Sequence, residues 1–471
     1  MAATAIVLVT LLTGLFITIR EERIAEAQRA RAERRFNDVR KLANSLLFDI
    51  HDQIRDLPGS TAARKVLVER AREYLDSLAQ ESSGDPGLQR ELAAAYQKVG
   101  DVQGNSRLAN LGDTAGAVDS YRKAVQIRLS LADATHGSTD DKTALLDAYM
   151  ELGMAQQESG DRAAALDTLS KANPIAEMLA AQLKTPESQE HLAAVQYIIA
   201  RCLRDANDLS GSLEHYKKSA TIRENITGAS PALQQQVQSR LAGVYGYMSG
   251  VVHEMGDLDA AISLQKKSRD ILTKLAESNP QNASLKEFIL QTDYWMAYYM
   301  TQKGLPDQAL ANYRQALEGY KELTTADPKD ALAKQYLGKC YVSMGGVLRT
   351  QGRAKEAIQA IRTGAKIFEE LITADSGKAV YRLMQVATTY SDLGDVYIQS
   401  AQGVNAGSAK ITDLHEARSW YQKAMETWGK VKEKNSPGKF DAAEFERLRK
   451  QVAKCDDALG RLRAQARAQS K

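Results

Sequence analysis

The segment GDTAGAVDSYRKA, residues 112–124, decides the fold because variants of it return six more times along the chain. In every copy the sixth and thirteenth residues are small, and the tenth is usually large. Successive sixth positions lie 48, 47, 49, 48, 48 and 60 residues apart, which predicts an array of similar structural units. The other copies are GDRAAALDTLSKA (160–172), NDLSGSLEHYKKS (207–219), GDLDAAISLQKKS (256–268), GLPDQALANYRQA (304–316), GRAKEAIQAIRTG (352–364) and TDLHEARSWYQKA (412–424).

The spacing within each copy predicts a closely packed helix. Residues seven apart, such as Ala117 and Ala124, lie on one helix face two turns apart. Small side chains at both places let a neighbouring helix approach closely. The large residue between them, Tyr121 in the first copy, would fill the space beside that contact.

A second helix pattern, Tyr-x-x-[Leu/Met/Val]-[Gly/Ser], precedes most copies. It spans Tyr96–Gly100, Tyr149–Gly153, Tyr245–Ser249, Tyr341–Gly345 and Tyr390–Gly394. Helix breakers mark the junctions between units: Pro186, Pro231, Pro280 and Pro328 recur every 45 to 49 residues. Each unit is therefore predicted to be a pair of helices of about 20 residues each. Pro174 is expected to shorten or kink the helix that contains it.

These helix pairs resemble the tetratricopeptide repeat, which has the same small–large–small pattern in its second helix. The resemblance covers about residues 88–435, although the standard unit is about 34 residues long and this one is about 48. HEAT-type repeats have a closer period but lack this pattern, and they are the alternative. The expected fold is all-α: a right-handed α-solenoid of about seven long tetratricopeptide-like helix pairs with capping helices.

The first residues predict a membrane anchor. Residues 2–19 carry no charge and would form a helix of about 27 Å, enough to span a bilayer. No basic residue precedes the run and no small-residue cleavage site follows it, which argues against a secretory signal. We therefore predict a transmembrane helix over residues 1–19, in contact with the lipid bilayer.

The segments flanking the repeats are predicted to be helices too. Residues 20–57 would form a juxtamembrane linker helix, whose heptad-like seam allows a homodimer. Residues 58–87 would form an N-terminal capping helix on the repeat array at 88–435. Apolar residues spaced three and four apart predict a C-terminal capping helix, followed by a basic tail, over residues 436–471.

Residues 32–79 and 95–124 also resemble the region that follows the transmembrane helix in bacterial serine/threonine protein kinases of the PknB type. The resemblance implies a bacterial cytoplasmic-membrane protein with extracytoplasmic repeats, acting as the sensor or partner-binding arm of a signalling kinase. The eight basic residues among residues 20–41 would instead place the repeats in the cytoplasm if Met1 is the true start. A free-standing membrane-tethered scaffold is the corresponding alternative.

The sequence offers no catalytic machinery. It contains no kinase HRD or DFG motif, no Walker A loop and no HExxH motif, so we predict that the chain is not an enzyme. An unrecognised active site in the groove is a remote alternative. No metal or cofactor site is predicted, and Cys202, Cys340 and Cys455 are expected to be core thiols. Lys plus Arg (62) nearly balances Asp plus Glu (59), which argues against nucleic-acid binding.

The expected function is protein binding by the repeats. In tetratricopeptide arrays the first helices line a concave groove that holds protein or peptide ligands, and tyrosine recurs in the first helices here. Tyrosine suits such surfaces because it combines a rigid contact area with a polar tip. The candidate partner-binding residues are the recurring Tyr149, Tyr245 and Tyr341, together with Tyr294, Trp295 and Tyr298 of the aromatic run at 293–300. Core packing is the alternative role for all six.

Overall fold

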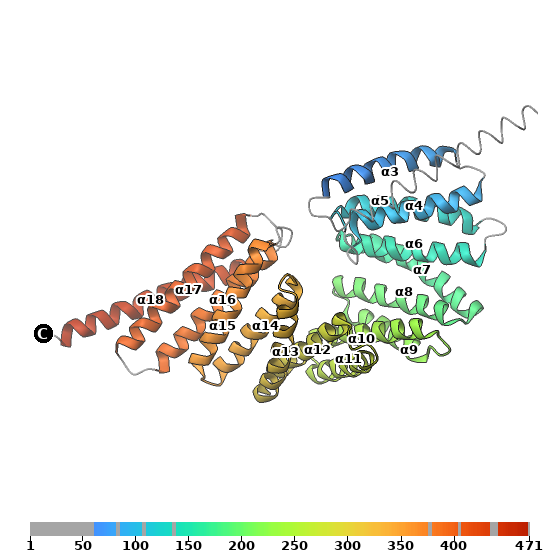
Figure 1. The fold of residues 1–471 in the computed structure, drawn as a ribbon. Coiled ribbons are helices and arrows are strands. Elements are labelled where there is room, and N and C mark those ends of the chain that lie inside the picture. The colour runs from blue at the N-terminus through green and yellow to red at the C-terminus, as the bar shows by residue number, and fades with distance from the viewer. Residues whose placement is uncertain are drawn as a thin grey trace, which may run out of the picture. The chain divides into compact units, whose positions relative to one another are not determined.

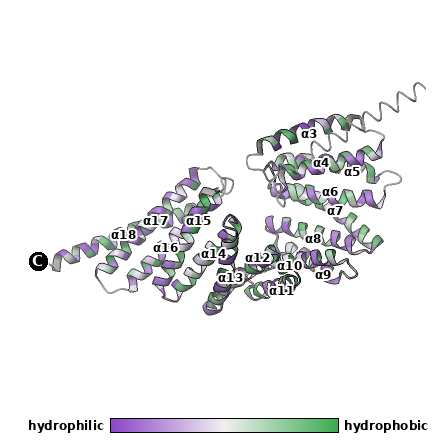
Figure 2. Cartoon of the chain, viewed as in Figure 1, coloured by the Kyte–Doolittle hydropathy of each residue, from purple (hydrophilic) through white to green (hydrophobic). Residues whose placement is uncertain are grey.

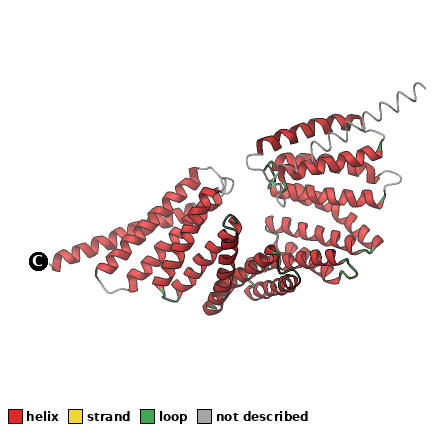
Figure 3. Ribbon diagram, in the orientation of Figure 1, coloured by secondary structure: helices red, strands yellow, loops and turns green. Residues whose placement is uncertain are grey.

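The computed structural model describes residues 61–81, 85–105, 110–133, 138–374, 379–403, 407–433 and 441–469. Within these ranges the chain folds into sixteen α-helices, labelled α3 to α18 in Figure 1, and contains no β-strand (Figure 3). The predicted all-α class is therefore confirmed for the described residues. The handedness predicted for the array stays a prediction.

The chain divides into two compact units, Met1–Ala206 and Asn207–Lys471. The described helices of the first unit are α3 (Thr61–Glu81), α4 (Pro86–Gly104), α5 (Thr114–Asp133), α6 (Thr139–Glu158), α7 (Arg162–Leu183) and α8 (Pro186–Asp205). The division falls inside the third predicted repeat, in the turn that joins its two helices.

The second unit holds ten described helices. They are α9 (Leu209–Asn225), α10 (Pro231–Glu254), α11 (Leu258–Ser278), α12 (Ala283–Gln302), α13 (Pro306–Ala326), α14 (Ala331–Thr350), α15 (Ala354–Ala374), α16 (Ala379–Gly403), α17 (Ser408–Glu433) and α18 (Ala442–Gln469). Here α10, α12, α14 and α16 are the first helices of their repeats, and α11, α13, α15 and α17 are the second helices. Consecutive helices of this unit pack against each other along the chain.

The turn between the two helices of a repeat follows from two adjacent residues. Gly160 and Gly256 have positive φ values of 87° and 90°, a left-handed conformation that glycine adopts without strain. The next residues, Asp161 and Asp257, then cap the following helix by accepting a hydrogen bond from a backbone N–H. Asn207 takes the same place in the third repeat with φ 64°, and asparagine is among the side chains that tolerate this conformation.

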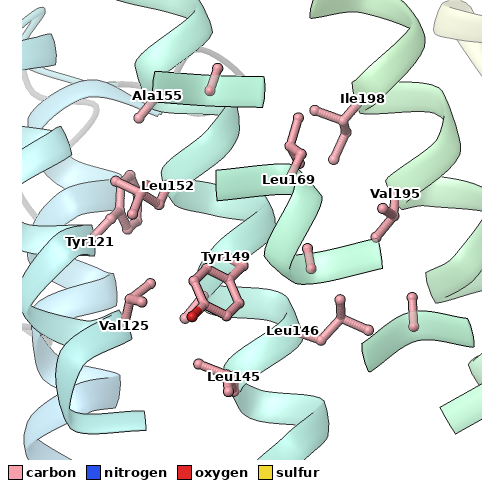
Figure 4. Packing of buried hydrophobic residues seen from close by; sticks show 14 of the residues in the cluster. Tyr121, Val125, Leu145, Leu146, Tyr149, Leu152, Ala155, Leu169, Val195 and Ile198 are labelled. Atoms are coloured by element: carbon pink, nitrogen blue, oxygen red, sulfur yellow. The ribbon is translucent and has the colours of Figure 1, made fainter. Parts of the chain in front are cut away.

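The predicted contact between small and large residues is present inside the repeats (Figure 4 shows part of this core). A Cβ atom added to Gly100 would lie 2.7 Å from the ring of Tyr121, and one on Gly345 would lie 2.4 Å from Ile361. Such distances are too short for real carbon atoms, so only glycine fits beneath these side chains. The sixth residues of the seven copies are all fully buried: Ala117, Ala165, Ser212, Ala261, Ala309, Ala357 and Ala417.

Prolines take the places that the pattern predicts, with one difference. Pro186 and Pro231 occupy the first turns of α8 and α10, where the missing N–H has no helical partner to lose. Pro174, however, lies inside α7, and the helix continues for nine further residues to Leu183. The expected shortening of that helix is therefore absent.

The first and last described helices, α3 and α18, pack against the helices next to them in the chain. The α3 helix buries Val68, Ala71, Leu75 and Leu78 in a cluster shared with α4. The α18 helix buries Leu448 and Cys455 against residues of α16 and α17. The capping role predicted for residues 58–87 and 436–471 stays a prediction.

One prediction is corrected by the structure. We predicted a single-pass protein of the cytoplasmic membrane, but none of the helices described between Thr61 and Gln469 is long and apolar enough to cross a bilayer. Their apolar residues are interleaved with polar ones and pack against neighbouring helices (Figure 2). The membrane localisation is therefore not carried further. The apolar run at 2–19, the linker helix at 20–57 and the homodimer contact expected there lie outside the described residues.

Candidate protein-binding surface

The recurring first-helix tyrosines lie mostly in the core. Tyr149 and Tyr245 are each 6% exposed, while Tyr341 is partly buried against the core of the second unit. Their burial favours a packing role, and partner binding at these three residues stays a prediction.

Three of the five recurring first-helix tyrosines, Tyr96, Tyr245 and Tyr390, also make a hydrogen bond to the preceding helix. The Tyr96 hydroxyl donates a 2.5 Å hydrogen bond to Asp76 on the preceding helix α3. The Tyr245 hydroxyl donates in the same way to Glu224 on α9, and Tyr390 donates to Glu369 on α15 over 2.6 Å. Each bond ties a first helix to a carboxylate 20 or 21 residues earlier in the chain. Tyrosine therefore combines buried area with a polar contact to the preceding helix.

The fifth repeat carries an aspartate at this position. Asp293 is 1% exposed and accepts a 2.5 Å charge-assisted hydrogen bond from Nε of Arg269 on the preceding helix α11. Its second oxygen, Oδ2, is buried without a partner in the described structure. Burial raises the pKa of Asp293, against the opposing effect of the bond from Arg269.

The aromatic run at 293–300 packs on several sides at once. Tyr294 is 7% exposed, and its ring centroid lies 5.7 Å from that of Tyr313 and 5.6 Å from that of Tyr336. Trp295 and Tyr298 are partly buried, with ring centroids 5.6 Å apart in an edge-to-face arrangement. These contacts join α12, α13 and α14. Tyr294 is thus a core residue in this structure, whereas Trp295 and Tyr298 keep part of their surface open to solvent.

Most of the large exposed hydrophobic side chains described in the second unit lie on the first helices of its repeats. Four of them have exposed fractions of 43% to 46%, and each lies on a different first helix. They are Tyr247 on α10, Phe288 on α12, Leu332 on α14 and Tyr381 on α16. A fifth, Met255, follows the end of α10. In the first unit, by contrast, Val66, Leu129 and Leu183 lie on α3, α5 and α7.

Sequence reasoning missed these four side chains because no repeating position marks them. Tyr247 follows the recurring Tyr245 by two residues, and Phe288 precedes Asp293 by five. Only Leu332 and Tyr381 share one place, nine residues before the recurring tyrosine of their repeats. Because a solvent-facing position carries no packing constraint, its residue type need not repeat.

Metal-binding groups and reactive thiols were sought among the described residues. No group of three or more His, Cys, Asp or Glu side chains among them is arranged to hold a metal ion. The three cysteines are free and buried, as predicted for core thiols. Burial raises the pKa of Cys202 and of Cys455 to about 11 and that of Cys340 to about 12, so these thiols are poor nucleophiles near neutral pH. That the chain is not an enzyme stays a prediction.

Comparison with known proteins finds similarity at the level of structure only. No protein-family model and no curated protein sequence matches the chain. Among solved structures, the apo form of RapI has 15% identity and a TM-score of 0.47, covering 72% of this chain and 99% of RapI.

Two further structures are similar to parts of the chain. BtubC from P. vanneervenii has 16% identity and a TM-score of 0.43, covering 57% of this chain and 91% of BtubC. A putative kinesin light chain from Podospora anserina, described as having nearly identical TPR-like repeats, has 19% identity and a TM-score of 0.33, covering 51% and 95%. All three TM-scores are below 0.5, so these similarities carry no argument about the fold. The helix-pair architecture is established by the packing described above.

Proposed function

We propose that this chain is a non-catalytic scaffold that binds protein segments on the first-helix surface of its second unit. This surface is defined by Tyr247, Phe288, Leu332 and Tyr381, and the proposal rests on their distribution. All four are large, apolar or aromatic, and more than two-fifths exposed.

Two physical arguments support the proposal. Exposure of hydrophobic side chains to water is unfavourable, and burying them against a partner lowers the free energy. Their concentration on the first helices is typical of a surface that becomes covered by a partner. Tyrosine and phenylalanine are also the side chains that carry much of the binding energy at protein interfaces. The helix pairs beneath them are rigid because their small and large core residues interlock, so the surface is held in place before a partner binds.

The test is partner capture by purified variants. In one variant Tyr247, Phe288, Leu332 and Tyr381 are all replaced by serine, and the proteins retained from a lysate of the source organism are compared with those retained by the unmodified chain. We expect the variant to lose the specifically retained proteins. Because all four side chains are exposed, its helical circular dichroism should be unchanged.

The matched control replaces Val66, Leu129 and Leu183, the exposed hydrophobic residues of the first unit, by serine. The control should keep the retained proteins. Loss of the same proteins from both variants, or from neither, would contradict the proposed location of the binding surface.

We further propose that the scaffold is the partner-binding arm of a bacterial serine/threonine kinase system. The resemblance of residues 32–79 and 95–124 to kinases of the PknB type supports this setting. The native locus tests it: the reading frame should continue upstream of Met1 into HRD and DFG motifs. A promoter and ribosome-binding site directly before Met1 would instead favour a free-standing scaffold.

A further inference from the structure

Asp392 on α16 is a partly buried carboxylate that makes no hydrogen bond or ion pair within the described part of the chain. Asp395 lies one turn further along the same helix, so the two residues share a face. Asp395 is well paired, because it accepts hydrogen bonds from the hydroxyl of Tyr421 on α17 (2.6 Å) and from Nη1 of Arg447 on α18 (3.1 Å). Two carboxylates one turn apart repel each other when both are charged, and Asp392 lacks a bond that would offset this repulsion.

The cation that α18 brings to this cluster already serves other groups. Nε of Arg447 donates a 2.7 Å hydrogen bond to Glu444 on its own helix, and Nη1 donates to Asp395. The hydroxyl of Ser391, which precedes Asp392 in the chain, donates a 2.8 Å hydrogen bond to Glu444. One guanidinium therefore bonds two carboxylates and leaves the third, Asp392, without a direct partner.

The helix face that carries Asp392 also lies against the end of α14. Gln399 follows Asp392 by two turns on this face, and its side chain donates a 3.0 Å hydrogen bond to the backbone carbonyl of Arg349. Arg349 is the cation that α14 contributes, and its attraction favours the charged form of Asp392. The two side chains form no ion pair, so this attraction acts across a gap.

The helices α15 and α17 also pack against α16, but their charged and titratable groups meet other residues there. The contacts are Glu369 with Tyr390, Arg362 with Tyr397, Asp413 with Ser400 and Tyr421 with Asp395. Arg362 is the cation in this set, and Tyr397 lies about 140° around the helix from Asp392 at roughly 100° per residue. These contacts therefore bring no cation to Asp392.

The surroundings favour the neutral form of this carboxyl group. Burial and the neighbouring carboxylate of Asp395 raise the pKa of Asp392 from 3.8 to about 7, and Glu444 acts in the same direction. Arg349 and Arg447 oppose the rise without cancelling it. The folded chain therefore keeps this proton over a pH range in which the unfolded chain has lost it.

From this arrangement we propose that Asp392 is a proton-sensitive switch that sets how firmly the last three helices, α16, α17 and α18, hold together (Figure 1). With the proton in place, the cluster contains two carboxylates, Asp395 and Glu444, and Arg447 bonds both. When the proton leaves to solvent, a third carboxylate stands on this face without a bonded cation, and the three helices open more often. Because α16 also carries the exposed Tyr381, pH then governs how firmly one part of the proposed binding surface is held.

The direction of the pH dependence follows from the two pKa values. Between pH 3.8 and about pH 7 the folded state binds one more proton than the open state, so the three helices become less stable as pH rises through this range. Above about pH 7 both states have lost the proton and the dependence ends. From about pH 5.5 to about pH 7.5 the opening equilibrium should rise roughly 20-fold.

The test is hydrogen exchange of the purified chain at about pH 5.5 and about pH 7.5, followed in peptides from α16, α17 and α18. After correction for the intrinsic pH dependence of amide exchange, we expect protection of these helices to be roughly 20-fold lower at the higher pH. Asp392→Asn replaces the titrating group by a neutral one of the same shape. This variant should keep, at both pH values, the protection that the unmodified chain has at the lower pH.

Two control variants separate other sources of a pH effect. His415→Gln removes the one histidine of residues 379–469, and Asp457→Asn removes an exposed carboxylate of α18. Both should keep the pH dependence of the unmodified chain. The proposal is overturned if the unmodified chain shows no dependence, if Asp392→Asn retains it, or if His415→Gln abolishes it. Low protection of Asp392→Asn at both pH values would overturn it too, because the amide mimics the protonated carboxyl group.

Discussion

The first helices of the fourth and fifth repeats each make a hydrogen bond to the preceding helix at the same position, but the direction of the bond is reversed between them. In α10, Tyr245 donates a hydrogen bond to the carboxylate of Glu224 on the preceding helix. In α12, Asp293 holds the equivalent place and accepts a hydrogen bond from Arg269 on the preceding helix. In these two repeats a hydrogen bond therefore joins neighbouring helix pairs at this position, and the donor lies on the first helix in one repeat and on the preceding helix in the other.

The two hydrogen bonds differ in the burial of the carboxylate that accepts them. Glu224 is exposed, so water can solvate it if its partner is lost. Asp293 is 1% exposed, whereas the side chain of Arg269 is 29% exposed. Loss of the partner should therefore be far more harmful in the fifth repeat than in the fourth.

The largest effect is expected from Arg269→Met. The change leaves Asp293 buried without its cation, and breaking a buried ion pair in this way destabilises a protein by about 3 kcal/mol near neutral pH. Urea unfolding, together with hydrogen exchange of α11 and α12, measures the loss. Lys274→Met, at an exposed position on α11, is the control and should be close to neutral.

The pH dependence of Arg269→Met has a defined sign. Burial raises the pKa of Asp293 in the folded chain above its ordinary value of 3.8, so the folded state holds this proton to higher pH than the unfolded state does. Stability from this group is therefore greatest at low pH and falls as pH rises through the raised pKa. In Arg269→Met the pKa rises further, and part of the loss should be recovered by acidification from about pH 7.5 to about pH 5. A loss that does not change with pH would show that charge is not its cause.

A second prediction concerns the small residue that lies four positions after the recurring first-helix tyrosine. In the fourth repeat it is Ser249, whose hydroxyl accepts a 2.7 Å hydrogen bond from Gln265. In the sixth it is Gly345, packed against Ile361. Gly345→Ala would place a carbon 2.4 Å from Ile361 and should destabilise the protein by about 2 kcal/mol.

The adjacent Gly346 is a matched control. A Cβ atom there meets nothing within 4 Å, so Gly346→Ala should stabilise α14 by about 0.5–1 kcal/mol through helix propensity alone. Thermal or urea unfolding of the two variants gives the comparison. Similar effects of both substitutions would contradict the interlocking of Gly345 with Ile361.

The smallest effect is expected from removing the tyrosine hydroxyl of the fourth repeat. Tyr245→Phe deletes the donor to the exposed Glu224 and should cost about 1 kcal/mol. Tyr320→Phe is the control, because the Tyr320 hydroxyl is buried without a hydrogen-bond partner in the described structure. Its removal should leave stability unchanged or raise it. A loss from Tyr320→Phe as large as that from Tyr245→Phe would mean that the Tyr320 hydroxyl has a partner after all.

The proposed binding surface was much less predictable from the sequence than the fold. The recurring tyrosines were visible in the sequence because packing constrains them, and for the same reason Tyr149 and Tyr245 are buried. Tyr247 and Tyr381, which are exposed, leave no repeating signal.

The helix pairs, their period and the residues at their contacts could all be predicted from the repeating pattern. Small residues seven apart, usually with a large residue between them, recur in all seven copies because close helix packing constrains them, and a Gly-Asp turn recurs in three of the copies. The hydrogen bonds of Tyr96, Tyr245 and Tyr390 to the preceding helix, and that of Asp293 with Arg269, became visible in the folded chain alone. The tertiary structure also decided which aromatic residues stay exposed, because exposure depends on contacts between helices that lie far apart in the chain.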